Sequence, residues 1–296
     1  MTVRFSIITT CKGRLEHLKA SLPAMLEQAD SEVIVVDYSC PDETAAYVGE
    51  HFPAARTVSV VGEKDFSNWK ARNAGAAVAK GRFLVFCDAD IVLAADATKK
   101  LAERLTPASF GYFHNDASKE AAPGKIAMAV NQLKGFQIVS RENFQKVGGY
   151  DELLSGYAAG GDTELEERLR FLRLDMVPLD RDIVERVISH DDSARMRFHG
   201  GPALQSYLIG YLYRWIKIAL MGIRKGSELE PSTKTDLHGL ATRGASSFLA
   251  QNKPTAIKLA VVDEPLKMFQ IQGKPAPRLK VTINVEIVPG RRSEPE

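Results

Sequence analysis

The first ninety residues alternate short apolar runs with segments of helical spacing, and no other feature restricts the fold as strongly. The apolar runs are rich in β-branched and aromatic residues and predict strands at Arg4–Thr9, Val33–Val36, Thr57–Val61 and Phe83–Phe86. Between them, Leu15–Gln28 has leucines at helical spacing and Asn68–Ala79 is rich in alanine, so both are predicted helices. Pro41 opens a further predicted helix. This alternation predicts βαβ units, an α/β fold with a mostly parallel central sheet flanked by helices.

The later part of the chain is less regular. We expect a strand over Gly135–Ser140, helices over Arg141–Lys146 and Glu164–Leu174, and a short strand over Arg186–Ser189. Residues 226–253 are polar and are assigned no element. Residues 279–288 alternate apolar and polar side chains, as a half-buried strand does.

Residues 203–225 form a predicted amphipathic helix. Their apolar stretch is about as long as a membrane span, but Arg214 and Lys217 near its centre make burial in lipid unfavourable. Two interpretations remain: the helix packs on the domain or on a partner subunit, or it lies on a membrane surface.

The composition excludes several classes of protein. The formal net charge is +2, which gives no reason to expect nucleic acid as a partner. Three cysteines without paired spacing indicate reduced thiols in a cytoplasmic protein, and the N-terminus lacks the pattern of a secretion signal.

Two Asp-x-Asp triplets occur, and their contexts differ. Asp88 and Asp90 follow a strand of four apolar residues, whereas Asp180 and Asp182 lie in a short segment after a proline. Ligands of parallel α/β sheets bind at the carboxyl ends of strands, and two carboxylates there can hold a divalent cation beside a diphosphate. We therefore expect a metal site at Asp88 and Asp90. The alternative is a structural strand cap.

Several motifs together resemble family-2 glycosyltransferases of the GT-A fold over the first 200 residues. The segments that carry the resemblance are Ser6–Arg14, Glu32–Asp37, Ala71–Gly75, Asp88–Asp90, Gly148–Glu152 and Gly160–Leu165. The last two resemble the acceptor-side motif of β-1,4-galactosyltransferases, with Gly161 where relatives usually have glutamate. The resemblance implies residues 1–92 as a nucleotide-binding half, 93–200 as an acceptor-binding half, and 201–296 as a C-terminal extension.

The resemblance also implies roles for individual residues. The implied function is transfer of a hexose from a UDP-sugar to an acceptor hydroxyl with inversion, in glycan or polysaccharide synthesis. Asp162 would be the general base, and Mn²⁺ or Mg²⁺ would be bound by Asp88, Asp90 and His190. Gly149, Tyr150, Asp151 and Gly161 would contact the acceptor. The donor would be bound by Thr9, Thr10, Lys12, Arg14, Asp37, Arg72, Asn73, Asp88 and Ala89.

Alternatives remain for several of these assignments. Asp162 could cap a helix instead, His190 and Arg72 could be surface residues, and Arg72 could pair with a phosphate or with Asp37. Trp69 could stack on a base or sugar, but core packing is the simpler role. A sugar nucleotidyltransferase and an inactive nucleotide-sugar-binding scaffold are the alternative functions. We expect the acceptor to be a glycan or a lipid-linked sugar. Peripheral contact of the protein with the inner face of the cell membrane and formation of a homo-oligomer are both left open.

Overall fold

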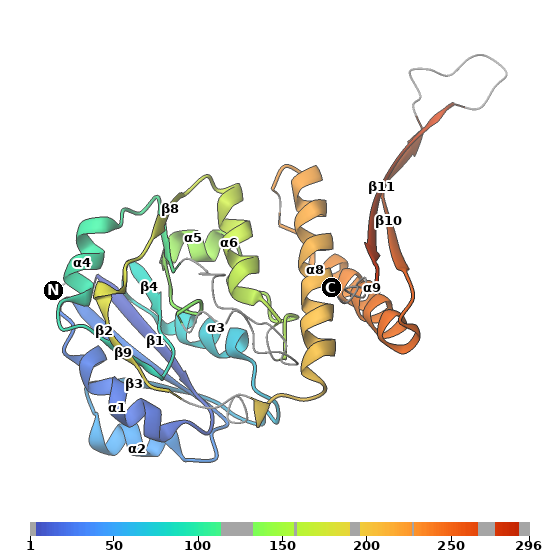
Figure 1. Cartoon of the computed structure of the whole chain (residues 1–296). Coiled ribbons are helices and arrows are strands. Elements are labelled where there is room, and N and C mark those ends of the chain that lie inside the picture. The colour runs from blue at the N-terminus through green and yellow to red at the C-terminus, as the bar shows by residue number, and fades with distance from the viewer. Residues whose placement is uncertain are drawn as a thin grey trace, which may run out of the picture. The chain divides into compact units, whose positions relative to one another are not determined.

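The computed structural model describes residues 4–113, 133–156, 159–189, 196–226, 228–265 and 276–289 (Figure 1). His190 and the C-terminal tail lie outside these ranges. The chain divides into two compact units. Unit 1 comprises Met1–Tyr157 and Gly161–Gly200, and unit 2 comprises Ala158–Gly160 and Gly201–Glu296.

Unit 1 contains a seven-stranded sheet with the strand order β3-β2-β1-β4-β7-β6-β8. The strands β1 to β4 pair in parallel, whereas β7 runs antiparallel to both β4 and β6. Its strands are β1 (Phe5–Cys11), β2 (Ser31–Tyr38), β3 (Arg56–Val60), β4 (Phe83–Phe86), β6 (Ser109–Tyr112), β7 (Gln137–Ser140) and β8 (Asp175–Pro178). The predicted α/β fold with a mostly parallel sheet is confirmed.

Helices cover both faces of this sheet (Figure 1). Side chains of successive strand residues point to opposite faces, so Ile7 packs in one core and Ile8 in the other. The Ile7 core includes residues of α1 (Leu15–Leu26), α2 (Thr44–His51) and α4 (Ala97–Arg104). The Ile8 core includes residues of α3 (Asn68–Val78), α5 (Arg141–Lys146) and α6 (Gly161–Phe171).

The strand register brings distant segments to one edge of the sheet. Cys11 lies opposite Asp37, so β1 and β2 end side by side. Gln137, the first residue of β7, lies opposite Phe86, the last residue of β4, because these two strands are antiparallel. A small separate sheet pairs β5 (Ile91–Leu93) with β9 (Val184–Val187), which follows the 3-10 turn η1 (Arg181–Ile183).

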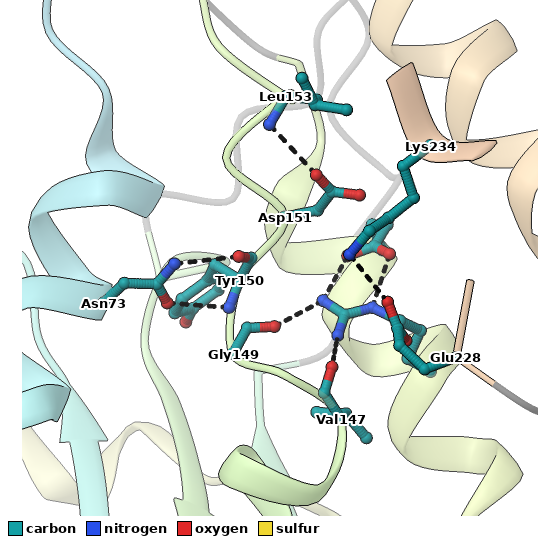
Figure 2. A network of polar contacts seen from close by, with 10 residues as sticks. Asn73, Val147, Gly149, Tyr150, Asp151, Leu153, Glu228 and Lys234 are labelled. Carbon is teal, nitrogen blue, oxygen red and sulfur yellow. Dashed lines mark hydrogen bonds and ion pairs between the residues drawn. The ribbon is translucent and has the colours of Figure 1, made fainter. Parts of the chain in front are cut away.

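Unit 2 contains two long helices and a two-stranded antiparallel sheet. They are α8 (Ala203–Ile223), α9 (Pro231–Gln251), β10 (Thr255–Pro265) and β11 (Arg278–Ile287). The predicted late strand is present as β11, but its partner β10 and helix α9 were not predicted. Lys234 of α9 pairs with Glu228 at 3.0 Å (Figure 2).

Helix α8 is present, but the two charged residues near its centre are not exposed. Arg214 is 9% exposed and Lys217 is fully buried, whereas Tyr207, Tyr211 and Trp215 are exposed by 39–48%. The Arg214 guanidinium lies over the rings of Tyr211 and Trp215, so aromatic faces shield its charge. Within the described parts of the chain, no helix combines the length and apolarity needed to cross a membrane.

Candidate active site

The segment after β4 carries the two carboxylates predicted to bind metal. Asp88 is partly exposed, with 31% of its side-chain surface open, whereas Asp90 is nearly buried at 7%. The Asp90 carboxylate lies 3.6 Å from Arg14 Nη1. Backbone contacts fix the turn, because the Ile91 amide donates to Asp88 O and the Ile188 amide donates to Asp90 O.

Arg72 lies at the centre of the site. It is 1% exposed, so the interpretation as a surface arginine is wrong, and its partner is Asp88 rather than Asp37. Its Nη2 donates to Asp88 Oδ1 at 2.6 Å and its Nη1 donates to Tyr150 Oη at 3.1 Å. Burial alone would lower the pKa of Arg72, but Tyr150 and Asp88 raise it above the ordinary value. Arg72 therefore stays charged and holds Asp88 in position.

A chain of hydrogen bonds continues from Tyr150 to Asp162. The Tyr150 hydroxyl donates to Gln137 Oε1 at 2.8 Å, and Gln137 Nε2 donates to Asp162 O at 3.0 Å. Burial raises the pKa of the Tyr150 hydroxyl, so this group stays protonated and able to donate. These contacts connect the predicted metal ligand Asp88 with the predicted base Asp162 through side chains of unit 1.

Asp162 lies within the first turn of α6, because the helix begins at Gly161 and not at Glu164 as predicted. Its Oδ1 accepts a hydrogen bond from the Thr163 amide at 2.8 Å, and its side chain is half-buried. An acid in the first turn also stabilises the helix dipole. The geometry is therefore compatible with a base and with a helix-stabilising role.

Asn73 connects α3 to the predicted acceptor loop (Figure 2). Its Nδ2 donates to Tyr150 O at 3.0 Å and to Glu152 Oε1 at 2.9 Å, and its Oδ1 accepts from the Tyr150 amide at 2.9 Å. The Asn73 amide, predicted to bind the donor, is thus engaged with the acceptor loop. Gly149 has a φ of +74°, and a Cβ there would lie 2.8 Å from Asn73 Oδ1, so glycine is required.

Arg168 of α6 holds the same loop from the other side. It forms a two-pronged ion pair with Glu164 at 2.6 and 2.7 Å. It also donates to the carbonyl oxygens of Val147 and Gly149 (Figure 2). Arg168 is 2% exposed and Glu164 is fully buried. Two helices therefore fix the backbone that presents Tyr150 and Asp151, and the Asp151 carboxylate accepts from the Leu153 amide at 3.1 Å.

Trp69 explains why residue 161 is glycine. A Cβ at Gly161 would lie 2.5 Å from the indole ring of Trp69, which leaves no room for the glutamate that the predicted motif would place there. The Trp69 ring stacks on Tyr150 with a centroid distance of 5.0 Å and remains half-buried. Trp69 thus packs in the core and also borders the segment that carries Asp162.

Two further predicted donor residues, Lys12 and Asp37, lie at the ends of β1 and β2. Both oxygens of the Asp37 carboxylate accept backbone amides, those of Cys40 and Ala45, each at 2.8 Å. Lys12 Nζ donates to three carbonyl oxygens, those of Tyr38, Ser39 and Glu63. Asp37 and Lys12 therefore order the loops at this edge of the sheet.

Three other predicted donor residues are largely buried at this edge. Thr10 Oγ1 donates to Asn68 Oδ1 at 3.0 Å. Thr9 is fully buried on β1. Ala89, after β4, is also buried, and its carbonyl oxygen accepts a hydrogen bond from Ser21 Oγ at 2.7 Å.

Sequence reasoning missed Gln137, Arg168 and Glu164. The four-residue spacing of Glu164 and Arg168 was a usable signal, because such residues lie on one face of a helix. The position of Gln137 depends on the antiparallel pairing of β7 and β4, which no local pattern indicates.

The residues present fit a hard divalent cation. Asp88 and Asp90 offer carboxylate oxygens at one turn, and such oxygens together with phosphate oxygens are ligands that Mg²⁺ and Mn²⁺ accept. The described residues contain no group of three histidine, cysteine, aspartate or glutamate side chains that could hold a metal. The third predicted ligand, His190, lies outside the described residues. Ile188, which precedes His190 by two positions in the sequence, donates its amide to Asp90 O.

Comparisons with known proteins agree with this architecture. Residues 6–112 match the family model described as Glycosyl transferase family 2. The chain is similar to S. aureus TarS 1-349 in complex with UDP-GlcNAc, with a TM-score of 0.56 and 15% identity over 84% of this chain and 76% of that one. It is also similar to mannosyltransferase PcManGT from Pyrobaculum calidifontis in complex with GDP-Man and Mn²⁺, with a TM-score of 0.51 and 15% identity over 83% and 74% of the two chains.

The comparison with curated protein sequences finds no match. At these identities the structural likeness shows the fold alone. Unit 1 has the GT-A fold of glycosyltransferases, with the family-2 match confined to the segment from β1 to β6.

Proposed function

We propose that this chain is a metal-dependent glycosyltransferase that moves a hexose from a UDP-sugar to a hydroxyl of a glycan or lipid-linked acceptor, with inversion. The observation that carries the proposal is the hydrogen-bonded path from Asp88 through Arg72, Tyr150 and Gln137 to Asp162. It connects the Asp88 carboxylate after β4 with the backbone carbonyl of Asp162 in the first turn of α6. The family match over residues 6–112 and the nucleotide-sugar complexes of the similar structures support the same class of reaction.

In this proposal, Asp88, Asp90 and His190 hold Mn²⁺ or Mg²⁺. The cation supplies charge neutralisation for the leaving diphosphate. Arg72 keeps Asp88 oriented, and the partial exposure of Asp88 leaves it accessible to a ligand. Arg14, 3.6 Å from Asp90, adds positive charge on the same side.

Asp162 accepts the proton of the acceptor hydroxyl as that oxygen attacks the anomeric carbon. Direct attack from the side opposite the leaving group inverts the anomeric configuration. The stacked rings of Trp69 and Tyr150 lie next to Gly161. The loop that carries Tyr150 is held by hydrogen bonds from Asn73 and Arg168. A fixed loop favours transfer because misplacement of the acceptor reduces the rate steeply.

Calorimetry with UDP and Mn²⁺ tests the metal assignment. Asp90→Ala should abolish metal-dependent UDP binding. The matched control is Asp180→Ala, in the second Asp-x-Asp triplet, whose carboxylate is 79% exposed and pairs with Arg104. UDP affinity unchanged by Asp90→Ala would remove Asp90 from the metal site.

Asp162→Asn separates a base from a helix-stabilising residue. Asparagine keeps a side-chain oxygen that can accept the Thr163 amide, but it is uncharged and accepts no proton at neutral pH. The variant should bind UDP and Mn²⁺ like the parent and lose transfer, since a general base contributes about 10²–10⁴-fold. Parent-like turnover would refute the base. If the parent with Mn²⁺ released no UDP from any UDP-sugar, a scaffold protein would be favoured. If it formed UTP from a UDP-sugar and pyrophosphate, a nucleotidyltransferase would be favoured.

A further inference from the structure

Two of the three cysteines lie next to each other at the edge of the sheet where β1 and β2 end. Cys11 is the last residue of β1 and Cys40 follows β2, and their sulfur atoms are 3.9 Å apart. The third cysteine, Cys87 at the end of β4, is buried and has no contact with this pair among the described hydrogen bonds. The register explains the proximity, because Cys11 lies opposite Asp37, which binds the Cys40 amide at 2.8 Å.

The two thiols differ in environment. Cys40 is half-buried and its sulfur accepts the Gly13 amide at 3.0 Å, whereas Cys11 is fully buried and its sulfur accepts the Thr44 hydroxyl at 3.2 Å. The hydrogen bond from Cys11 lowers the pKa of Cys40 to about 6, and the same contact raises the pKa of Cys11. Cys40 is therefore the accessible nucleophile and Cys11 a thiol held beside it.

We propose that Cys11 and Cys40 form a reversible oxidation site, which hydroperoxides convert to an intramolecular disulfide that weakens donor binding. The effect on donor binding rests on the function proposed above. Formation of the disulfide rests on the position of the two sulfur atoms alone. In a reducing cytoplasm the pair stays as thiols, and an oxidant would convert it.

The chemistry is balanced with hydrogen peroxide as the oxidant. The Cys40 thiolate attacks one peroxide oxygen, the O–O bond breaks and hydroxide leaves, which gives a sulfenic acid on Cys40. Cys11 sulfur then attacks Cys40 sulfur, so the S–S bond forms, the S–O bond breaks, and the Cys11 proton leaves with hydroxide as water. The two thiols lose two electrons and the peroxide gains them. A dithiol reductant reverses the step by thiol–disulfide exchange.

Disulfide formation would disturb the loop after β1. A disulfide is about 2.0 Å long, so the two sulfur atoms must approach by about 1.9 Å. Cys11 is held in the hydrogen-bonded ladder of β1, so the movement falls on Cys40 and on the Gly13 amide bound to it. Gly13 lies between Lys12, which binds the carbonyl oxygens of Tyr38 and Ser39, and Arg14, which lies beside Asp90.

The test uses the full chain, reduced, freed of reductant and treated with hydrogen peroxide. Peptide mapping by mass spectrometry should show Cys11 joined to Cys40 with the loss of two hydrogen atoms, and Cys87 still alkylatable after denaturation. In Cys11→Ser, oxidation should stop at a sulfenic acid on Cys40 that dimedone traps. Cys87→Ser should form the disulfide like the parent. The proposal would be overturned if the peroxide-treated parent kept both thiols intact. It would also be overturned if the disulfide involved Cys87 or a second chain. Mapping of the parent does not depend on the folding of any variant.

Calorimetry with UDP and Mn²⁺ tests the effect on the donor. The oxidised parent should bind UDP about tenfold more weakly than the reduced parent, a difference of about 1.4 kcal/mol, and dithiothreitol should restore the affinity. Equal affinities with the disulfide present would refute the link to donor binding. Absence of UDP binding in the reduced protein would refute the proposed function, whatever the state of the cysteines.

Discussion

Replacing Arg168 by methionine should destabilise unit 1 by an amount that the structure allows us to estimate. Methionine keeps much of the side-chain volume but removes the charge that pairs with Glu164, which is fully buried. Leaving one charge of a buried pair uncompensated costs about 3–5 kcal/mol. The carbonyl oxygens of Val147 and Gly149 also lose a donor. We therefore expect the free energy of unfolding of Arg168→Met to fall by at least about 3 kcal/mol, and the melting temperature to fall by about 6–20 °C.

Urea unfolding followed by tryptophan fluorescence provides the measurement. The chain has two tryptophans, Trp69 in unit 1 and Trp215 in unit 2, and Trp215 is 48% exposed. A Trp215→Phe background leaves Trp69 as the only indole, so its signal reports unit 1. Trp69 also stacks on Tyr150, next to the loop that Arg168 holds.

The matched control is Arg170→Met on the same helix. Arg170 is exposed, so its loss should change the free energy of unfolding by less than about 0.5 kcal/mol. The double variant Glu164→Leu, Arg168→Met should be more stable than Arg168→Met, because it removes the unpaired buried charge. Two results would show that the buried pair does not hold the loop. One is a free energy of unfolding of Arg168→Met within about 1 kcal/mol of that of Arg170→Met. The other is a loss of stability in the double variant equal to the sum of the losses in Glu164→Leu and Arg168→Met measured separately.

Three further predictions concern neighbouring parts of the site. Gly161→Ala places a methyl group 2.5 Å from the Trp69 ring, so the emission of Trp69 should shift and unit 1 should lose about 1–3 kcal/mol; an unchanged spectrum would contradict the packing. Asn73→Asp should destabilise unit 1 by about 1–3 kcal/mol in urea, because a carboxylate cannot donate to Tyr150 O. Iodoacetamide should alkylate Cys40 of the native protein with a midpoint near pH 6 and a rate that falls below it; a midpoint near the ordinary value of 9.0 would refute the Cys11 contact.

The fold up to Phe86 follows from periodicity in the sequence, whereas β5, α4 and β6 after it were not predicted. The predicted strands and helices up to Phe86 agree with the structure to within a few residues at each end, because their apolar spacing matches the faces they bury. The position of Asp88 and Asp90 at the end of β4 follows from the apolar run before them.

Helix α9 was not predicted because its sequence is polar and contains two glycines, Gly239 and Gly244. A signal was nevertheless present. Pro231 occupies the first turn, where proline is favoured, and Leu237, Ala241 and Ala245 recur every four residues and are buried. Gly244 packs against Ile257 of β10, where a Cβ would lie 2.4 Å away, so a small residue is needed for tertiary packing. Local propensity gives no indication of such a requirement.

The partners within the site were less predictable than the site residues themselves. Arg72 lies 16 positions from Asp88, and Asn73 lies 77 positions from Tyr150. Which of several carboxylates an arginine contacts depends on the relative placement of α3 and the sheet, and side-chain spacing along the chain does not contain that information. The sequence identified the residue types that could act, whereas the packing of α3 against β1 and β2 determined which of them meet.

Helix α3 connects the two sides of the site because Arg72 contacts both Asp88 and Tyr150, and the adjacent Asn73 also contacts Tyr150. Arg72 holds Asp88 and the hydroxyl of Tyr150, and Asn73 holds the backbone of Tyr150. A shift of this turn would therefore displace the proposed metal ligand and the proposed acceptor loop together. Arg168 anchors that loop independently from α6, through the carbonyl oxygens of Val147 and Gly149. The carboxylate side and the loop side of the site cannot move independently of each other while these contacts persist, so substitutions in α3 should affect donor and acceptor binding jointly.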